Sequence, residues 1–274
     1  MKAKPARVRN STATRPAKAS FSPRIRSQWT ETPGGLVHSV VSTIPLSPTA
    51  RTVVLVHGLV ISSRYMIPTA ERLGSLCRVY AIDLPGYGKS YQPKNVLSLS
   101  ELADALATWM TVLGLAKAHF VANSFGCQIL AEFALRHPER VDRLVFQGPT
   151  IDPAARSLMR QLLRLIVNSR REHPSLGRIT RMDYRAAGLR RAWATIKMAL
   201  ADPIETKLPS IQAPTLVVRG ENDPVVPQSW AEGAVRLLPR GELRVIANAA
   251  HTLNYSAPEK FVAAILPFLH SADS

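Results

Sequence analysis

The sequence contains little cysteine and no long apolar run. Its 274 residues include only Cys77 and Cys127, which provide neither a disulfide framework nor the spacing of a metal site. We therefore expect two free thiols and a cytoplasmic protein. No segment approaches the roughly 18 consecutive apolar residues of a membrane-spanning helix, so no membrane span is expected. A hydrophobic content of 46% in a chain of this length fits one sizeable globular domain.

Acidic residues are missing from the first thirty positions, where eight Lys and Arg side chains give a charge of +8. This stretch has no apolar periodicity and cannot bury enough surface to offset the entropy of ordering. Residues 1–30 are therefore predicted to form a disordered basic tail. The tail lacks the apolar core of a secretory signal. Its only aromatic residues are Phe21 and Trp29, which argues against specific nucleic-acid binding.

The rest of the positive charge lies in one internal segment. Residues 150–208 carry twelve basic and five acidic side chains, a net charge of +7, whereas the remainder of the chain outside the tail has a net charge of +1. The total of +16 thus belongs to a tail and an insert, and not to a continuous basic face. This distribution indicates at most weak, nonspecific contact with polyanions.

From residue 35 onward, strand-like apolar runs alternate with helical patterns. This alternation predicts an α/β fold, with a mostly parallel central sheet and helices on both faces. The strands are expected at 36–42 (on an edge), 53–56, 78–82, 118–122, 141–147, 215–219 and 242–246. The helices are expected at 67–76, from a cap at Ser98 or Ser100 to 113, and at 128–136, 228–238 and 258–270.

The alternation stops between residues 150 and 208. Only two helical patterns, at 153–168 and 185–201, occur in this segment. We therefore expect a core domain made of residues 31–149 and 209–274, with 150–208 as a helical insert.

Ser124 stands between a β-branched strand pattern and a long helical pattern, with Ala122 and Gly126 two positions away on either side. Small residues at these positions permit a sharp turn that thrusts the central side chain outward above the sheet edge, as in a nucleophile elbow. The alternative is a serine that caps the following helix. A reactive serine also requires partners elsewhere in the chain.

Asp223 and His251 are the candidate partners. A serine hydroxyl is a weak nucleophile unless a histidine takes its proton, and the histidine needs a carboxylate that fixes its tautomer. Each of the two residues follows a predicted strand, so both are expected with Ser124 at the carboxyl edge of the sheet. Separately, Asp223 could be a turn residue and His251 a packing residue. Together they predict a catalytic set, with Glu221 as the reserve acid.

Residues 35–270 resemble the α/β-hydrolase fold superfamily. The motifs that carry the resemblance are His57-Gly58 after a strand, the loop Asp83-Leu84-Pro85-Gly86-Tyr87-Gly88-Lys89-Ser90, the elbow around Ser124, and the loops of Asp223 and His251. One departure is Ala122, where the commonest elbow has glycine. The resemblance implies an α/β-hydrolase fold in which 150–208 forms a cap over the active site. We expect Asp83 to order its loop.

The same resemblance implies an oxyanion hole made of backbone amides. The amide of Phe125, after the nucleophile, and the amide of Leu59 are its expected donors, and Val60 is the alternative to Leu59. His57 and Gly58 are expected to support this loop through hydrogen bonding and not to act as a base.

The first helix of the insert is amphipathic, because Leu158, Leu162 and Leu165 form one stripe beside a row of arginines. We expect a lid with a solvated basic face. The alternative is that arginines of the insert attract or pair with an anionic substrate group. The candidates for such contacts are Arg178, Arg181, Arg185, Arg190 and Arg191.

Together these residues predict a serine hydrolase that cleaves a small or medium ester, thioester or related acyl substrate through an acyl-enzyme. No metal and no organic cofactor are required. The expected partner is a small-molecule acyl substrate, no specific nucleic acid is expected, and the sequence indicates no oligomeric state. A serine at position 124 argues against relatives with a carboxylate nucleophile, such as haloalkane dehalogenases and epoxide hydrolases. The main alternatives are a carbon-carbon bond hydrolase of carboxylate-bearing dienones and a non-catalytic ligand-binding protein of the same fold. Lactonase, perhydrolase and acyltransferase activities also stay open.

Overall fold

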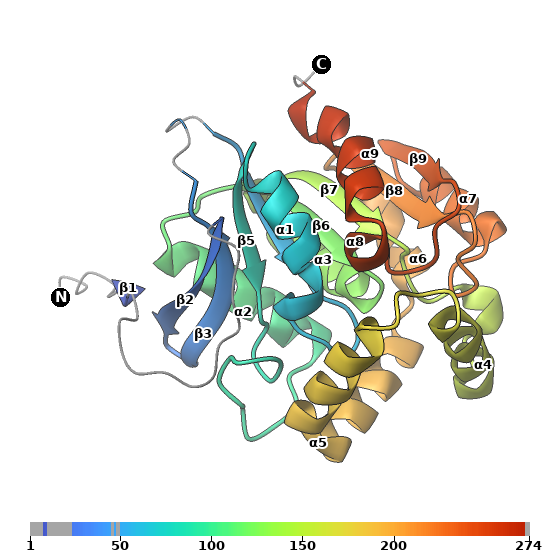
Figure 1. Ribbon diagram of the computed structural model, residues 1–274, viewed down its shortest axis with the longest axis horizontal. Coiled ribbons are helices and arrows are strands. Elements are labelled where there is room, and N and C mark those ends of the chain that lie inside the picture. The colour runs from blue at the N-terminus through green and yellow to red at the C-terminus, as the bar shows by residue number, and fades with distance from the viewer. Residues whose placement is uncertain (1–7, 10–23, 45–46, 48–49, 272–274) are drawn as a thin grey trace.

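A computed structural model describes residues 8–9, 24–44, 47 and 50–271. At the centre of this part of the chain is a nine-stranded sheet in the order β1-β2-β3-β5-β4-β6-β7-β8-β9 (Figure 1). The strands are β1 (Val8–Arg9), β2 (Ile25–Thr32), β3 (Gly35–Ser42), β4 (Thr52–Val56), β5 (Arg78–Ile82), β6 (Ala118–Asn123), β7 (Val141–Gln147), β8 (Thr215–Gly220) and β9 (Gly241–Ile246). The pairs from β5-β4 through β8-β9 are parallel, whereas β1, β2, β3 and β5 pair antiparallel. The predicted mostly parallel sheet is confirmed.

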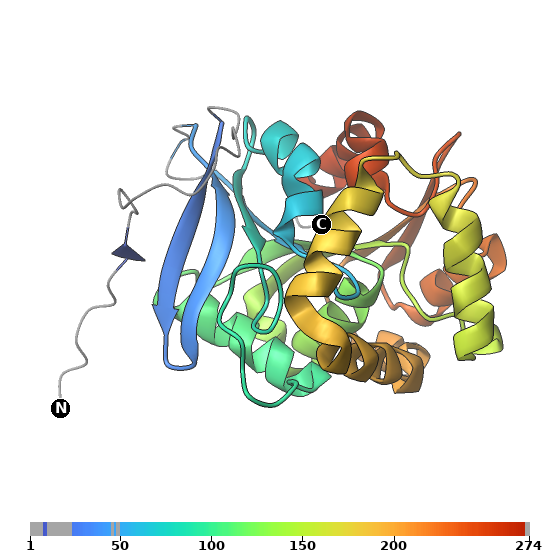
Figure 2. The same ribbon diagram turned by 60° about the horizontal axis from the view of Figure 1, so that its bottom comes forward.

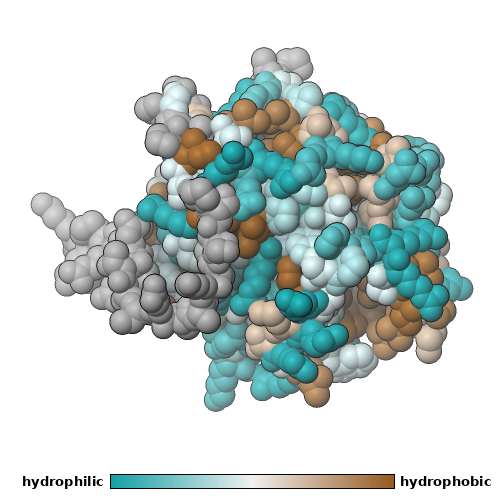
Figure 3. Space-filling model, in the orientation of Figure 1, coloured by the Kyte–Doolittle hydropathy of each residue, from teal (hydrophilic) through white to brown (hydrophobic). Residues whose placement is uncertain are grey.

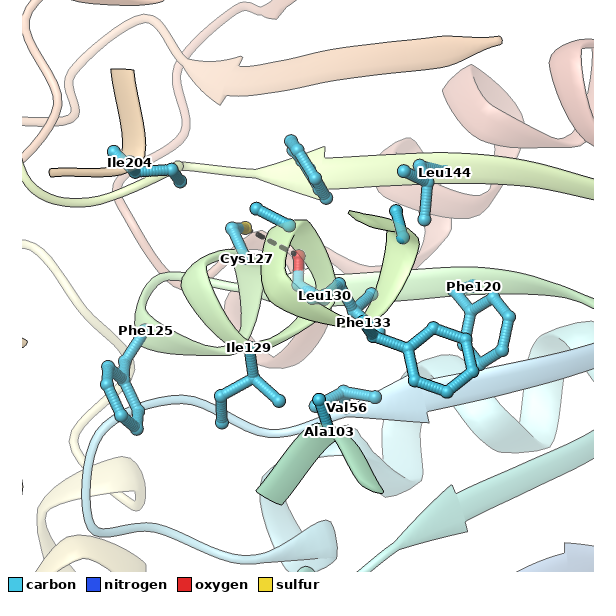
Figure 4. Packing of buried hydrophobic residues seen from close by; sticks show 14 of the residues in the cluster. Val56, Ala103, Phe120, Phe125, Cys127, Ile129, Leu130, Phe133, Leu144 and Ile204 are labelled. Carbon is cyan, nitrogen blue, oxygen red and sulfur yellow. Dashed lines mark hydrogen bonds between the residues drawn. The ribbon is translucent and has the colours of Figure 1, made fainter. Parts of the chain in front are cut away.

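Helices cover both faces of this sheet, as predicted. The helices of the core are α1 (Ile67–Leu73), α2 (Leu99–Val112), α3 (Phe125–Arg136), α7 (Gln228–Leu237), α8 (Leu253–Ser256) and α9 (Pro258–His270). Strand β4 shows how one apolar run serves two cores. Val54 and Val56 pack in the cluster of α2, α3 and α7, whereas Val53 and Leu55 pack in the cluster of α1 and α9. Figure 4 shows the first cluster around α3.

The seven predicted strands are all present, with ends that differ by at most one residue. One placement is wrong, because β3 is not an edge strand. It pairs with β2 along eight residues and with β5 on its other side.

Strand β2 also corrects the predicted disordered tail. Residues 25–30 belong to this strand, and Ile25 and Thr30 are buried. The strand is mostly polar, so it has no continuous apolar run, but its Ile, Trp and Thr residues favour extended backbone. The remainder of the predicted tail lies outside the described residues, apart from Arg24 and the two residues of β1.

The segment 150–208 contains helices and no strand, as predicted. Its elements are η3 (Pro153–Ala155), α4 (Leu158–Ser169), α5 (Leu176–Ala201), α6 (Ile204–Lys207) and η4 (Leu208–Ser210). Helix α5 begins nine residues before the predicted 185 and bends at Gly188, as Figure 2 shows in gold. We call residues 150–208 the insert.

The predicted orientation of the first insert helix is wrong. Leu158, Leu162 and Leu165 of α4 are exposed, while Gln161 and Asn168, on an adjacent strip of the helix surface, are buried. The spacing of apolar residues reveals a stripe on a helix but not the direction in which the stripe points.

Cys77 and Cys127 are free and buried, as expected. Among the described residues, no helix has both the length and the apolar composition needed to cross a membrane.

Helix α2 yields a test of local stability. Its N-terminus is closed by a capping box, in which the Ser98 side chain accepts from the Glu101 amide and the Glu101 carboxylate accepts from the Ser98 amide. We expect Ser98→Ala to lower the free energy of unfolding by about 1 kcal/mol in urea denaturation. Ser100→Ala is the control and should cost less, because Ser100 is not the cap. Equal losses in the two variants would contradict this assignment.

Candidate active site

Ser124 occupies a strained turn between β6 and α3. Its backbone has φ 57° and ψ −121°, and its side chain makes no capping hydrogen bond to α3, so the helix-cap alternative is wrong. Gly126 permits the turn, because a Cβ atom there would lie 2.7 Å from the His57 carbonyl oxygen and 2.9 Å from that of Val56. The geometry is that of a nucleophile elbow, with the N-terminus of α3 directly behind the serine.

His251 and Asp223 form a buried hydrogen-bonded pair. Nδ1 of His251 lies 2.8 Å from Oδ2 of Asp223, and the other carboxylate oxygen accepts from the amides of Val225 (2.7 Å) and Val226 (3.0 Å). Burial alone would lower the pKa of His251, but the charge of Asp223 and its hydrogen bond outweigh that effect, so the pKa is raised. The reserve acid Glu221 instead accepts from the Asn248 amide.

The serine and the histidine line the same cavity. Its volume is about 370 Å³, which is within the range of small-molecule sites. Nε2 of His251 is buried and has no hydrogen-bond partner among the described residues. A ring held by Asp223 at Nδ1 and free at Nε2 is suited to take a proton from a group in the cavity.

Gly148 positions the histidine ring and was not among the residues predicted from the sequence. It has φ 56°, and a Cβ atom there would lie 2.7 Å from Cε1 and 2.8 Å from Nδ1 of His251. The sequence signal was a glycine directly after the strand 141–147, at the sheet edge where the other site residues meet.

The His57-Gly58 turn is fixed by hydrogen bonds. The Leu84 amide donates to Nε2 of His57 at 3.1 Å, so Nδ1 carries the proton and donates to the Gly58 carbonyl oxygen at 3.0 Å. Burial lowers the pKa of His57 and keeps its ring neutral. The Gly58 amide donates to the hydroxyl of Tyr65 at 2.6 Å, which in turn donates to Asn123.

The candidate oxyanion donors differ in their access to the cavity. Leu59 lines the cavity, whereas Val60 is buried and is not among the lining residues. Phe125 is the first residue of α3, so its amide has no acceptor within the helix.

Asp83 orders its loop, as expected. Its carboxylate accepts from His38 at 2.8 Å and from the amides of Ser63 (2.6 Å) and Lys89 (2.9 Å). Burial raises the pKa of this carboxyl group, but the hydrogen bonds and the charge of His38 more than compensate and bring the pKa to about 2.

The arginines proposed for substrate binding do not line the cavity. Helix α5 contributes Leu176, Thr180 and Tyr184, which lie four residues apart on one face. The predicted candidates Arg178, Arg181, Arg185 and Arg190 lie off this face and are exposed, and Arg191 is buried against the carbonyl oxygen of Pro93. The helical period therefore turns the positive charge of α5 away from the cavity.

Two polar residues of the insert contact the histidine loop and were not predicted. Oδ1 of Asn168 accepts from the His251 amide at 3.2 Å, and the Glu172 carboxylate accepts from the Thr252 amide at 2.6 Å. Both residues line the cavity, and neither lies in a recognisable sequence motif. No group of three or more His, Cys, Asp or Glu side chains in the described ranges could hold a metal ion.

Gly148 provides a test of the site geometry. Gly148→Ala should reduce kcat by about 10- to 100-fold, because the new methyl group displaces the His251 ring. Gly114→Ala is the control: Gly114 also has positive φ (70°), but no atom lies within 4 Å of its Cβ position. Both variants should lose some stability from backbone strain, measured by thermal unfolding. Equal kcat values in the two variants would contradict the proposal that Gly148 leaves room for the His251 ring.

Comparison with known proteins agrees with this architecture. A hydrolase of 2-hydroxy-6-oxononadienedioate and 2-hydroxy-6-oxononatrienedioate from Paraburkholderia phymatum is 30% identical over 220 residues, which is 70% of this chain and 76% of that protein. Carboxylesterase YbfK of Bacillus subtilis is 28% identical and covers 80% of each chain. The solved structure of a thermophilic esterase from Thermogutta terrifontis matches with a TM-score of 0.72 and 25% identity, over 90% of this chain and 100% of the other. The alpha/beta hydrolase family model matches residues 53–264, and the chain belongs to that family of hydrolases.

Proposed function

We propose that this hydrolase cleaves esters or related acyl substrates through a covalent acyl-serine. The observation that carries the proposal is the meeting of Ser124, in its strained turn, and the His251–Asp223 pair at one cavity. A helix cap requires neither the positive φ nor the shared cavity.

The residues then take the following roles. Ser124 Oγ attacks the substrate carbonyl carbon while Nε2 of His251 accepts the hydroxyl proton, and the negative charge of Asp223 stabilises the imidazolium. The amides of Leu59 and Phe125 donate to the oxygen that becomes negative in the tetrahedral intermediate. His251 returns the proton to the leaving alcohol or thiol. Water, activated by His251, then attacks the acyl-serine and releases the acid.

The cavity favours a neutral, partly apolar acyl group. Its apolar lining includes Leu59, Ile61, Leu165 and Leu176, and no Lys or Arg is among the lining residues. Its one carboxylate, Glu172, would repel an anionic substrate group. The Paraburkholderia relative is named for dioate substrates, so the absence of Lys and Arg from the lining argues against the carbon-carbon hydrolase alternative and for the reaction in the name of YbfK.

The insert serves as a cap in this proposal. The insert contributes part of the cavity wall, and core residues such as Ser124 contribute the rest. The lining residues from the two longer helices of the insert are Leu165 and Asn168 of α4 and Leu176, Thr180 and Tyr184 of α5. These helices would exclude water from the acyl-serine and set the length of the acyl group that fits.

Covalent labelling tests the nucleophile. A fluorophosphonate probe should label the protein, and Ser124→Ala should abolish labelling, because the phosphonyl group transfers to an activated serine hydroxyl. Ser169→Ala is the matched control, since Ser169 also lines the cavity, and it should label as the wild type does. Gel fluorescence and intact mass provide the measurement. A folded wild-type protein that resists labelling would favour the non-catalytic ligand-binding alternative.

The pH profile tests the base. Below the pKa of His251 the ring is protonated and cannot accept a proton, so kcat/KM for a short p-nitrophenyl ester should rise with pH and reach half its maximum above the ordinary pKa of histidine. Asp223→Asn removes the charge that raises this pKa. We expect its midpoint to move to lower pH and its kcat to fall by about 10³- to 10⁴-fold. An unchanged midpoint would exclude Asp223 as the partner of His251.

A further inference from the structure

Helix α4 presents its apolar side to solvent. Met159 is 65% exposed, Leu163 56% and Leu162 49%, and Leu158, Leu165, Ile166 and Val167 are exposed as well. Figure 3 shows hydrophobic side chains gathered at the lower right of the molecule, where Figure 1 places α4. Surface helices of globular proteins normally turn this side toward the core, so an exposed apolar helix face indicates an interaction site.

Specific polar contacts hold α4 in this orientation. Gln161 donates to the Ala155 carbonyl oxygen at 2.8 Å, and Arg164 donates to the Asp152 carboxylate at 2.9 Å. Asn168, on the same side, accepts from the His251 amide. Rotation of the helix to bury its leucines would break all three contacts and would bury an arginine without its partner. The outward apolar face is therefore part of the folded state.

The charges around this face determine which occupant fits it. Between residues 158 and 201 every exposed charged side chain is basic, whereas Glu172 is half-buried and Asp183 is buried. On α4 and in the turn directly after it the exposed basic residues are Arg160, Arg170 and Arg171, and the others, Arg178, Arg181, Arg185, Arg190 and Lys197, are on α5. A second copy of the chain would bring arginines against arginines, which is unfavourable. An anionic surface with an apolar interior matches both the charge and the leucines.

We propose that α4 docks on an anionic lipid surface. Its twelve residues span about 18 Å, and the helix lies in the plane of the interface with its apolar side at the boundary of headgroups and acyl chains. Leu165, Asn168 and Ser169 of the same helix line the cavity, so docking places one wall of the cavity against the lipid. If Ser124 acts as proposed above, lipid-borne acyl groups lie next to its cavity, but the docking itself does not depend on catalysis.

Vesicle sedimentation tests the docking. The 274-residue chain should sediment with vesicles of phosphatidylcholine and phosphatidylglycerol at low salt, more weakly at high salt, and least with pure phosphatidylcholine. Leu163→Glu should weaken binding at least about tenfold, because it places a carboxylate at the acyl boundary. Leu189→Glu is the matched control: Leu189 is 91% exposed on α5, away from the face of α4, and this variant should bind nearly as the wild type does.

Three results would overturn the proposal. They are a lack of sedimentation with anionic vesicles at low salt, equal losses in the two glutamate variants, and a lipid-free dimer that Leu163→Glu dissociates in analytical ultracentrifugation. The last result would assign the apolar face to a second copy of the chain. Ser124→Ala should bind vesicles normally, so failed labelling with intact vesicle binding would reject only the proposed catalysis.

Discussion

The close approach of α3 to the end of β4 is the constraint on which the site depends. Gly126 lies against the carbonyl oxygens of Val56 and His57, with no space for a Cβ atom between them. This contact holds Ser124 at positive φ and brings the start of α3 beside the turn that follows β4. The nucleophile candidate and both oxyanion candidates are therefore positioned by one backbone contact, and the side chains around them are secondary to it.

The sequence revealed most of the fold because buried parallel strands are simple patterns. Residues 53–56 and 141–147 are packed against other elements on both faces of the sheet, so in the sequence they form apolar runs with clear ends. Strand β2 has no such pattern, because its partners and not its own hydrophobicity determine its place. The site residues Ser124, Asp223 and His251 each followed a strand, and the sheet edge brought their loops together.

Other features depended on directions in space that a linear pattern does not contain. The apolar stripe of α4 was evident from the sequence, but polar contacts of Gln161 and Asn168 turn it outward. The arginines of α5 were evident too, but helical geometry directs Leu176 and Tyr184, and not those arginines, toward the cavity. In the sequence Gly148 cannot be distinguished from other loop glycines. Only the structure shows that a methyl group at this position would clash with the ring of His251.

The contacts of Asn168 and Glu172 tie the candidate site to the insert. These side chains hold the successive backbone amides of His251 and Thr252, although they precede them by about eighty residues. The position of the His251 loop therefore depends on the seating of the end of α4 and the turn after it. The core sheet alone does not define where the His251 ring lies, because part of the support of its loop comes from a segment outside that sheet.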